Sequence, residues 1–206
     1  MAFFRTIGGG EDLANSYTAV VNNEYRMGTS CAYMFANNSS FNEPVVIGNN
    51  VANCAYTFYN CASFNQPVTI PDNVISCGMM ISNCAGFNQP VVIGNKVTNC
   101  YRMFMDAASF NQPVTIPDNV TTCSQMFSNC AGFNQPVVIG NNVTVCGYML
   151  SNCASFNQPV TIPDNVTTCS SMFLNCTSFN QPVVIGNNVT ACDSMFSNCG
   201  SFNQTI

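Results

Sequence analysis

Charged residues are scarce in this sequence. Only 6% of its 206 residues are Asp, Glu, Lys or Arg, against roughly 25% in an ordinary soluble domain. The formal net charge is −5, and the few basic residues are scattered along the chain. A nucleic acid would need a continuous basic stripe, so the sequence excludes it as a partner. Asn, Gln, Ser and Thr replace the missing charges and predict a neutral surface that repels copies of itself weakly.

The groups that most enzymes and metal sites use are also missing. The chain has no histidine, the side chain that most often transfers protons in active sites. Its cysteines are spaced as C-x6-C and C-x15-C, without the C-x-x-C pair that is typical of zinc sites. It also lacks a nucleophile elbow and paired carboxylates. We therefore expect no enzyme activity, no metal and no cofactor.

Long hydrophobic runs are absent. No stretch approaches the roughly 18 apolar residues of a membrane-spanning helix, so we expect no membrane insertion. Residues 1–17 hold one basic residue and no apolar run ahead of a Gly cluster, which is not the pattern of a secretory signal. The sequence predicts a protein that reaches a virion or the extracellular space by a non-classical route, or that otherwise stays in the cytoplasm.

What the sequence has in abundance is a repeat. Phe-Asn recurs every 23 residues without insertion or deletion. This period defines one repeat domain over residues 18–206, with a degenerate unit at 18–40, seven full units at 41–201 and a truncated unit at 202–206. Residues 1–17 do not share the pattern and are predicted to form a separate N-terminal segment or cap. The phenylalanines that mark the period are Phe41, Phe64, Phe87, Phe110, Phe133, Phe156, Phe179 and Phe202.

Each unit reads F-N-Q-P-V-x-I-[GP]-[ND]-N-V-T-x-C-x-x-M-F-x-N-C-x-[SG], and its two halves differ in periodicity. In the first half Val114 and Ile116 flank Thr115, which predicts a short strand with Thr115 outward. In the second half apolar residues recur at steps of three and one, typical of the inward face of a short α- or 3-10 helix. A strand and a short helix every 23 residues predict an α/β solenoid, a leucine-rich-repeat-like coil with stacked parallel strands.

The repeat resembles a known family. Residues 119–137, NVTTCSQMFSNCAGFNQPV, are similar to the BspA-like leucine-rich repeats of bacterial surface proteins. V-T, M-F, Cys and F-N-Q recur in register over about residues 18–206, with Cys where that group usually has Met, as at Cys123. The resemblance implies a right-handed solenoid, a role in adhesion or host recognition, and no active site. Similar repeats also occur in phage-encoded proteins.

The fourteen cysteines form two ladders when they are aligned with the repeat. Both ladders lie on the inward stripe of the second half-unit, and Ala107 interrupts one of them with another small apolar residue. In-register side chains on stacked coils rarely reach the torsion of a disulfide, so we predict reduced, buried thiols. The ladders are Cys31, Cys54, Cys77, Cys100, Cys123, Cys146, Cys169 and Cys192, and Cys61, Cys84, Cys130, Cys153, Cys176 and Cys199.

Asparagines recur in the same way. The sets that begin at Asn42 and at Asn60 are predicted to hydrogen-bond from coil to coil and to the turn backbone. Asp72, Asp118 and Asp164 recur every second unit, roughly 10 Å apart by the strand spacing. That separation is too long to share a proton or a cation, so we interpret them as turn residues.

Two rows of outward positions are candidates for contact with a partner. The middle strand residue alternates between Val and Thr, and this row is either a contact surface or an exposed site that expresses β-propensity. Its members are Val46, Thr69, Val92, Thr115, Val138, Thr161 and Val184. A second row varies while the frame stays fixed, as a ligand-specific surface would. It comprises Tyr56, Met79, Arg102, Gln125, Tyr148, Ser171 and Ser194.

Two functions fit these features. The first is a non-catalytic binding or adhesion module, on a bacterial or phage surface, that holds a protein or glycan on a cell surface. The alternative is a self-assembling structural protein that packs against copies of itself through its faces or open ends. The near-absence of charge, the near-identity of the units and the truncated last unit favour assembly. The array also has a 46-residue double unit, because V-V-I-G alternates with V-T-I-P.

Overall fold

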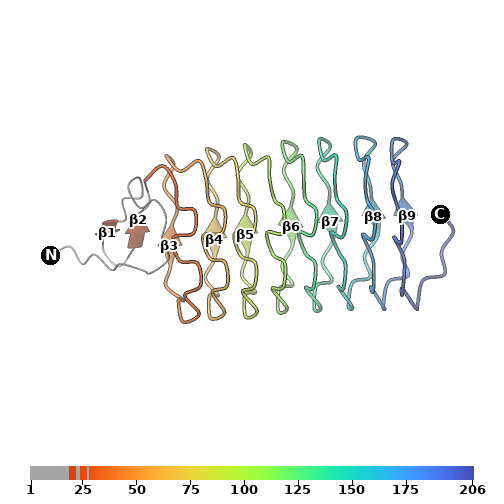
Figure 1. Ribbon diagram of the computed structural model, residues 1–206, viewed down its shortest axis with the longest axis horizontal. Coiled ribbons are helices and arrows are strands. Elements are labelled where there is room, and N and C mark those ends of the chain that lie inside the picture. Colours follow the sequence, from red (N-terminus) through yellow and green to blue (C-terminus); the bar gives the residue numbers. More distant parts are fainter. Residues whose placement is uncertain (1–18, 22–23, 27) are drawn as a thin grey trace.

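The computed structural model describes residues 19–21, 24–26 and 28–206 as an elongated stack of coils. Figure 1 shows the coils side by side in chain order, with the N- and C-termini at opposite ends. The predicted N-terminal segment at residues 1–17 lies outside the described residues. Nothing in the described part of the chain forms a helix long and apolar enough to cross a membrane.

The strands are very short, and one occurs in each coil. Val114 and Ile116 are buried while Thr115 between them is exposed, which confirms the predicted alternation. Two longer strands precede the regular coils. The strands are β1 (Ala19–Val21), β2 (Glu24–Arg26), β3 (Val45–Val46), β4 (Val68–Thr69), β5 (Val91–Val92), β6 (Val114–Thr115), β7 (Val137–Val138), β8 (Val160–Thr161) and β9 (Val183–Val184).

Parallel pairing joins successive coils. β1 and β2 form an antiparallel pair, and β2 then pairs in parallel with β3. Tyr25 lies opposite Val45, 20 residues later, so the degenerate unit is shorter than the 23-residue coils that follow. The later strands pair two by two, β4 with β5, β6 with β7 and β8 with β9. A second column of isolated parallel bridges runs from Ser30 to Ala191 and joins every coil to the next.

The predicted helix in the second half-unit is wrong. Within residues 28–206, this segment is a chain of consecutive turns rather than a helix. Met126 donates its N–H to Cys123, Ser128 to Gln125 and Cys130 to Phe127, so each turn closes over three residues. The third and seventh positions of the segment have positive φ, between 54° and 64°. A helix cannot contain such residues, whereas turns with positive φ at their third position are common.

Hydrogen bonds between coils explain why the turns replace a helix. The N–H groups that do not close a turn donate to the next coil, as Gln125 does to Gly147 and Phe127 to Met149. Alternate backbone groups thus serve the turns and the stack, and none is left for i→i−4 bonds. We call this segment the turn ladder, residues 123–130 and their counterparts in the other coils. The apolar steps of three and one that suggested a helix arise from the turn ladder.

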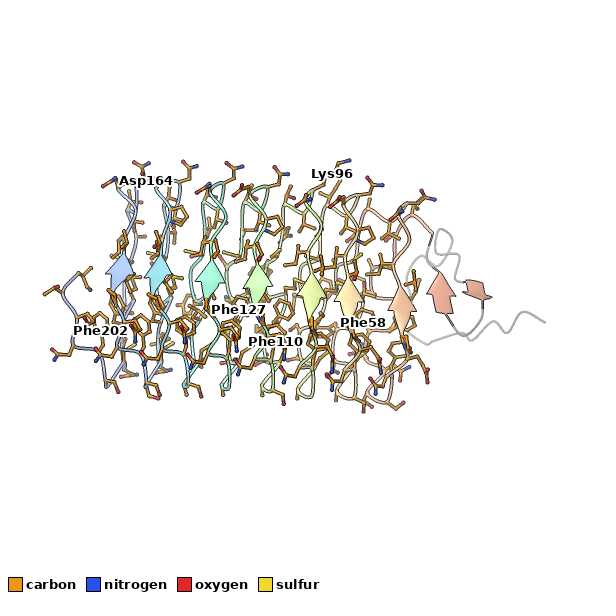
Figure 2. All side chains as sticks on the ribbon, turned by 180° about the vertical axis from the view of Figure 1, so that it is seen from behind. Phe58, Lys96, Phe110, Phe127, Asp164 and Phe202 are labelled. Atoms are coloured by element: carbon orange, nitrogen blue, oxygen red, sulfur yellow. The ribbon has the colours of Figure 1, made fainter. Side chains whose placement is uncertain are left out.

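The core lies inside the coils and is built from columns of identical side chains. Phe110, Phe133 and Phe156 stack on one another at ring-centroid distances of 5.9 and 6.0 Å. A second aromatic column packs beside the first, and Phe127 lies 4.4 Å from Phe133. Figure 2 shows the labelled phenylalanines at one level of the stack, with Lys96 and Asp164 at the opposite edge. Valines, isoleucines, methionines and cysteines complete one continuous core.

A close contact explains the 46-residue double unit. A Cβ added to Gly140 would lie 2.6 Å from the Pro117 carbonyl oxygen, and one on Gly94 would lie 2.3 Å from that of Pro71. The V-V-I-G coil therefore packs its glycine against the proline carbonyl of the preceding V-T-I-P coil. These are also the coils whose strands pair, as β6 and β7 do. Glycine is required here for space, since none of the described glycines has positive φ.

The Gly140→Ala variant is expected to lose about 1–3 kcal/mol of unfolding free energy, because its methyl group would push the two coils apart. Gly132→Ala is the matched control, since its Cβ would meet the Ala108 oxygen only at 3.4 Å. That substitution should be neutral or slightly stabilising. Urea denaturation followed by circular dichroism measures both variants. Equal stabilities for the two would contradict this account of the double unit.

Candidate functional site

The strand face is the row Val46, Thr69, Val92, Thr115, Val138, Thr161 and Val184. The structure brings these residues together, one per coil, and all of them are exposed. Val92, Val138 and Val184 are 60%, 65% and 61% exposed. The face is weakly polar and carries no charged member. That it contacts a partner stays a prediction.

The turn face is the row at the third position of the turn ladder, Tyr33, Tyr56, Met79, Arg102, Gln125 and Tyr148. Each residue donates its N–H to the next coil, as Tyr56 does to Gly78 and Tyr148 to Ser170. All six have positive φ. This conformation is unusual for large side chains, and the bonds to the neighbouring coil hold it. The row continues toward the C-terminus with the smaller Ser171 and Ser194.

Aromatic and basic side chains contact one another on the turn face. The Tyr33 and Tyr56 rings stack with centroids 4.4 Å apart, and Tyr59 packs edge-on against Tyr56. The Arg102 guanidinium lies 4.8 Å above the Tyr101 ring. Sequence reasoning selected positions 56, 102 and 148 but missed Tyr33, Tyr59 and Tyr101. The missed signal was that every tyrosine after residue 28 falls within the turn ladder.

The second cysteine ladder has a structural role. Each of its thiols donates a hydrogen bond to a main-chain carbonyl of the preceding coil, as Cys130 does to Phe104 and Cys153 to Phe127, both at 3.0 Å. Ala107 is fully buried at the equivalent place in its coil. Stacked coils therefore accept either a thiol or a methyl group there.

Burial changes the acidity of these thiols. Loss of solvent raises the pKa of Cys61 to about 11 and that of Cys84 to about 12. The pKa of Cys123 is also raised well above its ordinary value by burial. All fourteen cysteines are unpaired and, apart from Cys192, buried. At neutral pH the buried groups are uncharged, poorly nucleophilic thiols.

Asparagine ladders join the coils at their surface, as predicted. The Asn111 side-chain oxygen accepts the backbone N–H of Asn134 at 2.9 Å. In the other set, the Asn152 amide donates to Asn129 at 2.7 Å. The carboxylate of Asp164 accepts the Asn187 N–H at 2.8 Å, which supports its interpretation as a turn residue. In residues 28–206 no three His, Cys, Asp or Glu side chains converge as metal ligands would.

Comparison with known proteins places the repeat in a family. The family described as "Mycoplasma protein of unknown function, DUF285" matches residues 18–93, 72–162 and 117–206. These matches overlap and together cover the repeat array. No curated protein matches the sequence.

Solved structures share the architecture. A leucine-rich repeat protein from Bacteroides ovatus has a TM-score of 0.70 at 17% identity, over 88% of this chain and 47% of that one. The chain thus spans about half the length of that protein. A leucine rich cell surface protein from Faecalibacterium prausnitzii A2-165 has a TM-score of 0.36 at 14% identity, with 98% and 93% of the chains covered. The T. pallidum leucine-rich repeat protein has a TM-score of 0.46 at 13% identity, with 95% and 92% covered.

The Bacteroides structure confirms the leucine-rich-repeat solenoid at the level of the fold. The family match spans well over half of the sequence and carries the V-T, M-F, Cys and F-N-Q pattern of BspA-like repeats. The chain belongs to the family described as Mycoplasma protein of unknown function, DUF285, and is a BspA-like leucine-rich-repeat protein.

Proposed function

We propose that this chain is a non-catalytic binding and adhesion module, displayed on a cell or virion surface, that holds a protein or glycan on another surface. One observation carries the proposal. The core and the coil-to-coil contacts repeat almost unchanged, whereas the turn face presents Tyr, Met, Arg and Gln in successive coils. A fixed frame with one variable exposed row is how repeat proteins place binding residues.

The rigidity of the turn ladder supports the same function. The backbone groups of Tyr56, Arg102 and Tyr148 are hydrogen-bonded to the next coil, so their side chains start from fixed positions. Binding then orders fewer groups, which leaves more of the contact energy as affinity. The description of one structural neighbour as a cell surface protein agrees with display outside the cell.

Flow cytometry tests the proposal with the fluorescently labelled chain and a panel of animal and bacterial cells. We expect saturable binding to at least one cell type. Protease treatment of the cells should abolish binding if the partner is a protein, and glycosidase treatment if it is a glycan. A control variant replaces Tyr33, Tyr56, Arg102 and Tyr148 with Ser, which the chain itself carries at this position in Ser171 and Ser194. The absence of saturable binding to any cell would reject the proposal.

Self-assembly is the second candidate, and the exposed valines of the strand face favour it. Val92, Val138 and Val184 form the kind of apolar row that a second copy could cover. Such a chain would form filaments or regular oligomers in negative-stain images and elute early in size-exclusion chromatography. A monodisperse monomer would contradict assembly.

A further inference from the structure

The composition of the turn face points to a class of partner. Protein–protein interfaces are enriched in Tyr, Met and Arg and depleted in Lys, Glu, Ser and Ala. The turn face has the enriched types at Tyr33, Tyr56, Met79, Arg102 and Tyr148. Tyr33 and Tyr148 are 59% and 44% exposed. The strand face contains none of these types.

Arg102 is oriented but not neutralised. Its Nε donates to the Gln125 side-chain oxygen at 2.6 Å, and its guanidinium lies 4.8 Å above the Tyr101 ring. Among the described residues, no carboxylate pairs with this guanidinium, and its two terminal nitrogens make no hydrogen bond. A guanidinium held in this way presents a planar pair of donors that matches a carboxylate.

Arg102 also lies at the middle of an aromatic row. Tyr56 precedes it and Tyr148 follows it by 46 residues, or two coils. At about 4.8 Å per coil, each tyrosine is about 10 Å from Arg102 along the stack. The row from Tyr33 to Tyr148 is about 24 Å long by the same spacing, comparable to one side of a standard interface of about 800 Å² per partner.

We propose that the turn face binds a protein partner through an Asp or Glu carboxylate on Arg102, with apolar side chains of the partner on the flanking tyrosines. This inference rests on the proposed binding function and names its surface and its partner chemistry. Tyr and Arg are also the side chains that most often dominate the energy of protein interfaces.

The structure favours this partner over two others. A strand that added to the turn face would need free backbone donors, but the N–H groups of Tyr56, Arg102 and Tyr148 are already bonded to the next coil. A neutral glycan would leave the Arg102 guanidinium without an acceptor of opposite charge. Met79, on the same row, adds flexible apolar surface of the kind found at protein interfaces.

Panning a random dodecapeptide phage library on the immobilised full chain tests the proposal. We expect the selected peptides to carry an Asp or Glu flanked by apolar residues. Arg102→Gln should weaken binding of a synthesised selected peptide at least tenfold, and Tyr148→Ser should weaken it several-fold. Arg102→Lys should restore only part of the affinity, because an ammonium group cannot bind a carboxylate in the bidentate manner.

The variants are designed to fold, since the chain itself has Gln125 and Ser171 at the same coil position with positive φ. Thr115→Ser on the strand face is the control and should leave binding unchanged. Selected peptides without an acidic residue, or binding that survives Arg102→Gln, would overturn this inference while cell binding still stood. Binding on a glycan array that is lost in Tyr148→Ser, without any peptide selected, would replace the protein partner with a glycan. Failure of both peptide and cell binding would remove the proposed function as well.

Discussion

Raising the pH above about 9 is expected to unfold the protein, because its buried thiols ionise much more readily in the unfolded chain. A free cysteine has a pKa of about 8.5, whereas burial raises the pKa of both Cys84 and Cys146 to about 12. Between these values the unfolded chain releases protons that the native state keeps, so the unfolding free energy falls as the pH rises. Below about pH 8 both states are protonated and this effect vanishes.

The size of the effect follows from the number of thiols that act together. Each fully buried thiol lowers the unfolding free energy by up to about 1.4 kcal/mol per pH unit. Burial raises the pKa of Cys123, Cys130 and Cys153 as well. Several such groups would remove a typical stability of about 5–15 kcal/mol within two pH units. Circular dichroism between pH 7 and 12 should therefore show a cooperative loss of structure.

Removing thiols provides the control for the alkaline transition. The double variant Cys130→Ala and Cys153→Ala copies the replacement that the chain has at Ala107. It should be somewhat less stable at pH 7, because two hydrogen bonds to Phe104 and Phe127 are lost. Its stability should nevertheless fall less steeply above pH 9. An unchanged pH dependence would show that the thiols do not cause the transition.

The sequence is sufficient to predict the stack because burial at one coil position is repeated in every coil. The inward column from Phe41 to Phe202 and the outward residues such as Thr115 could be assigned from the period alone. The helix could not be tested in this way. Steps of three and one arise both in a helix and in successive turns, and the choice depends on bonds between coils. Asn60 and Asn129, which adopt positive φ readily, were the available signal.

The candidate surfaces show the same division. The pattern identified both exposed rows, since their residues vary or alternate while the frame is constant. It could not show that Arg102 contacts Tyr101 and Gln125, because side-chain contacts between coils depend on rotamers. The contact of Gly140 with the Pro117 carbonyl was also hidden, although the 46-residue alternation was visible. Spacing between coils decides that contact, and a linear pattern does not contain it.

Replacing Phe133 with Ala is expected to lower the unfolding free energy by about 3–5 kcal/mol. The ring is fully buried and stacks between Phe110 and Phe156, with Phe127 beside it at 4.4 Å. The coils above and below are held by their own hydrogen bonds and cannot collapse freely into the space. Chemical denaturation monitored by circular dichroism would measure the loss.

Leucine substitutions separate the two aromatic columns. The Phe127 column already accepts Ile81 and Leu150 in other coils, so Phe127→Leu should cost less than about 1.5 kcal/mol. The Phe133 column is phenylalanine in every unit from Phe41 to Phe202, and Phe133→Leu would interrupt ring stacking on both sides at once. We expect Phe133→Leu to be clearly the more destabilising of the two. Equal losses would mean that buried volume alone, and not the continuous stack, determines which residues each column accepts.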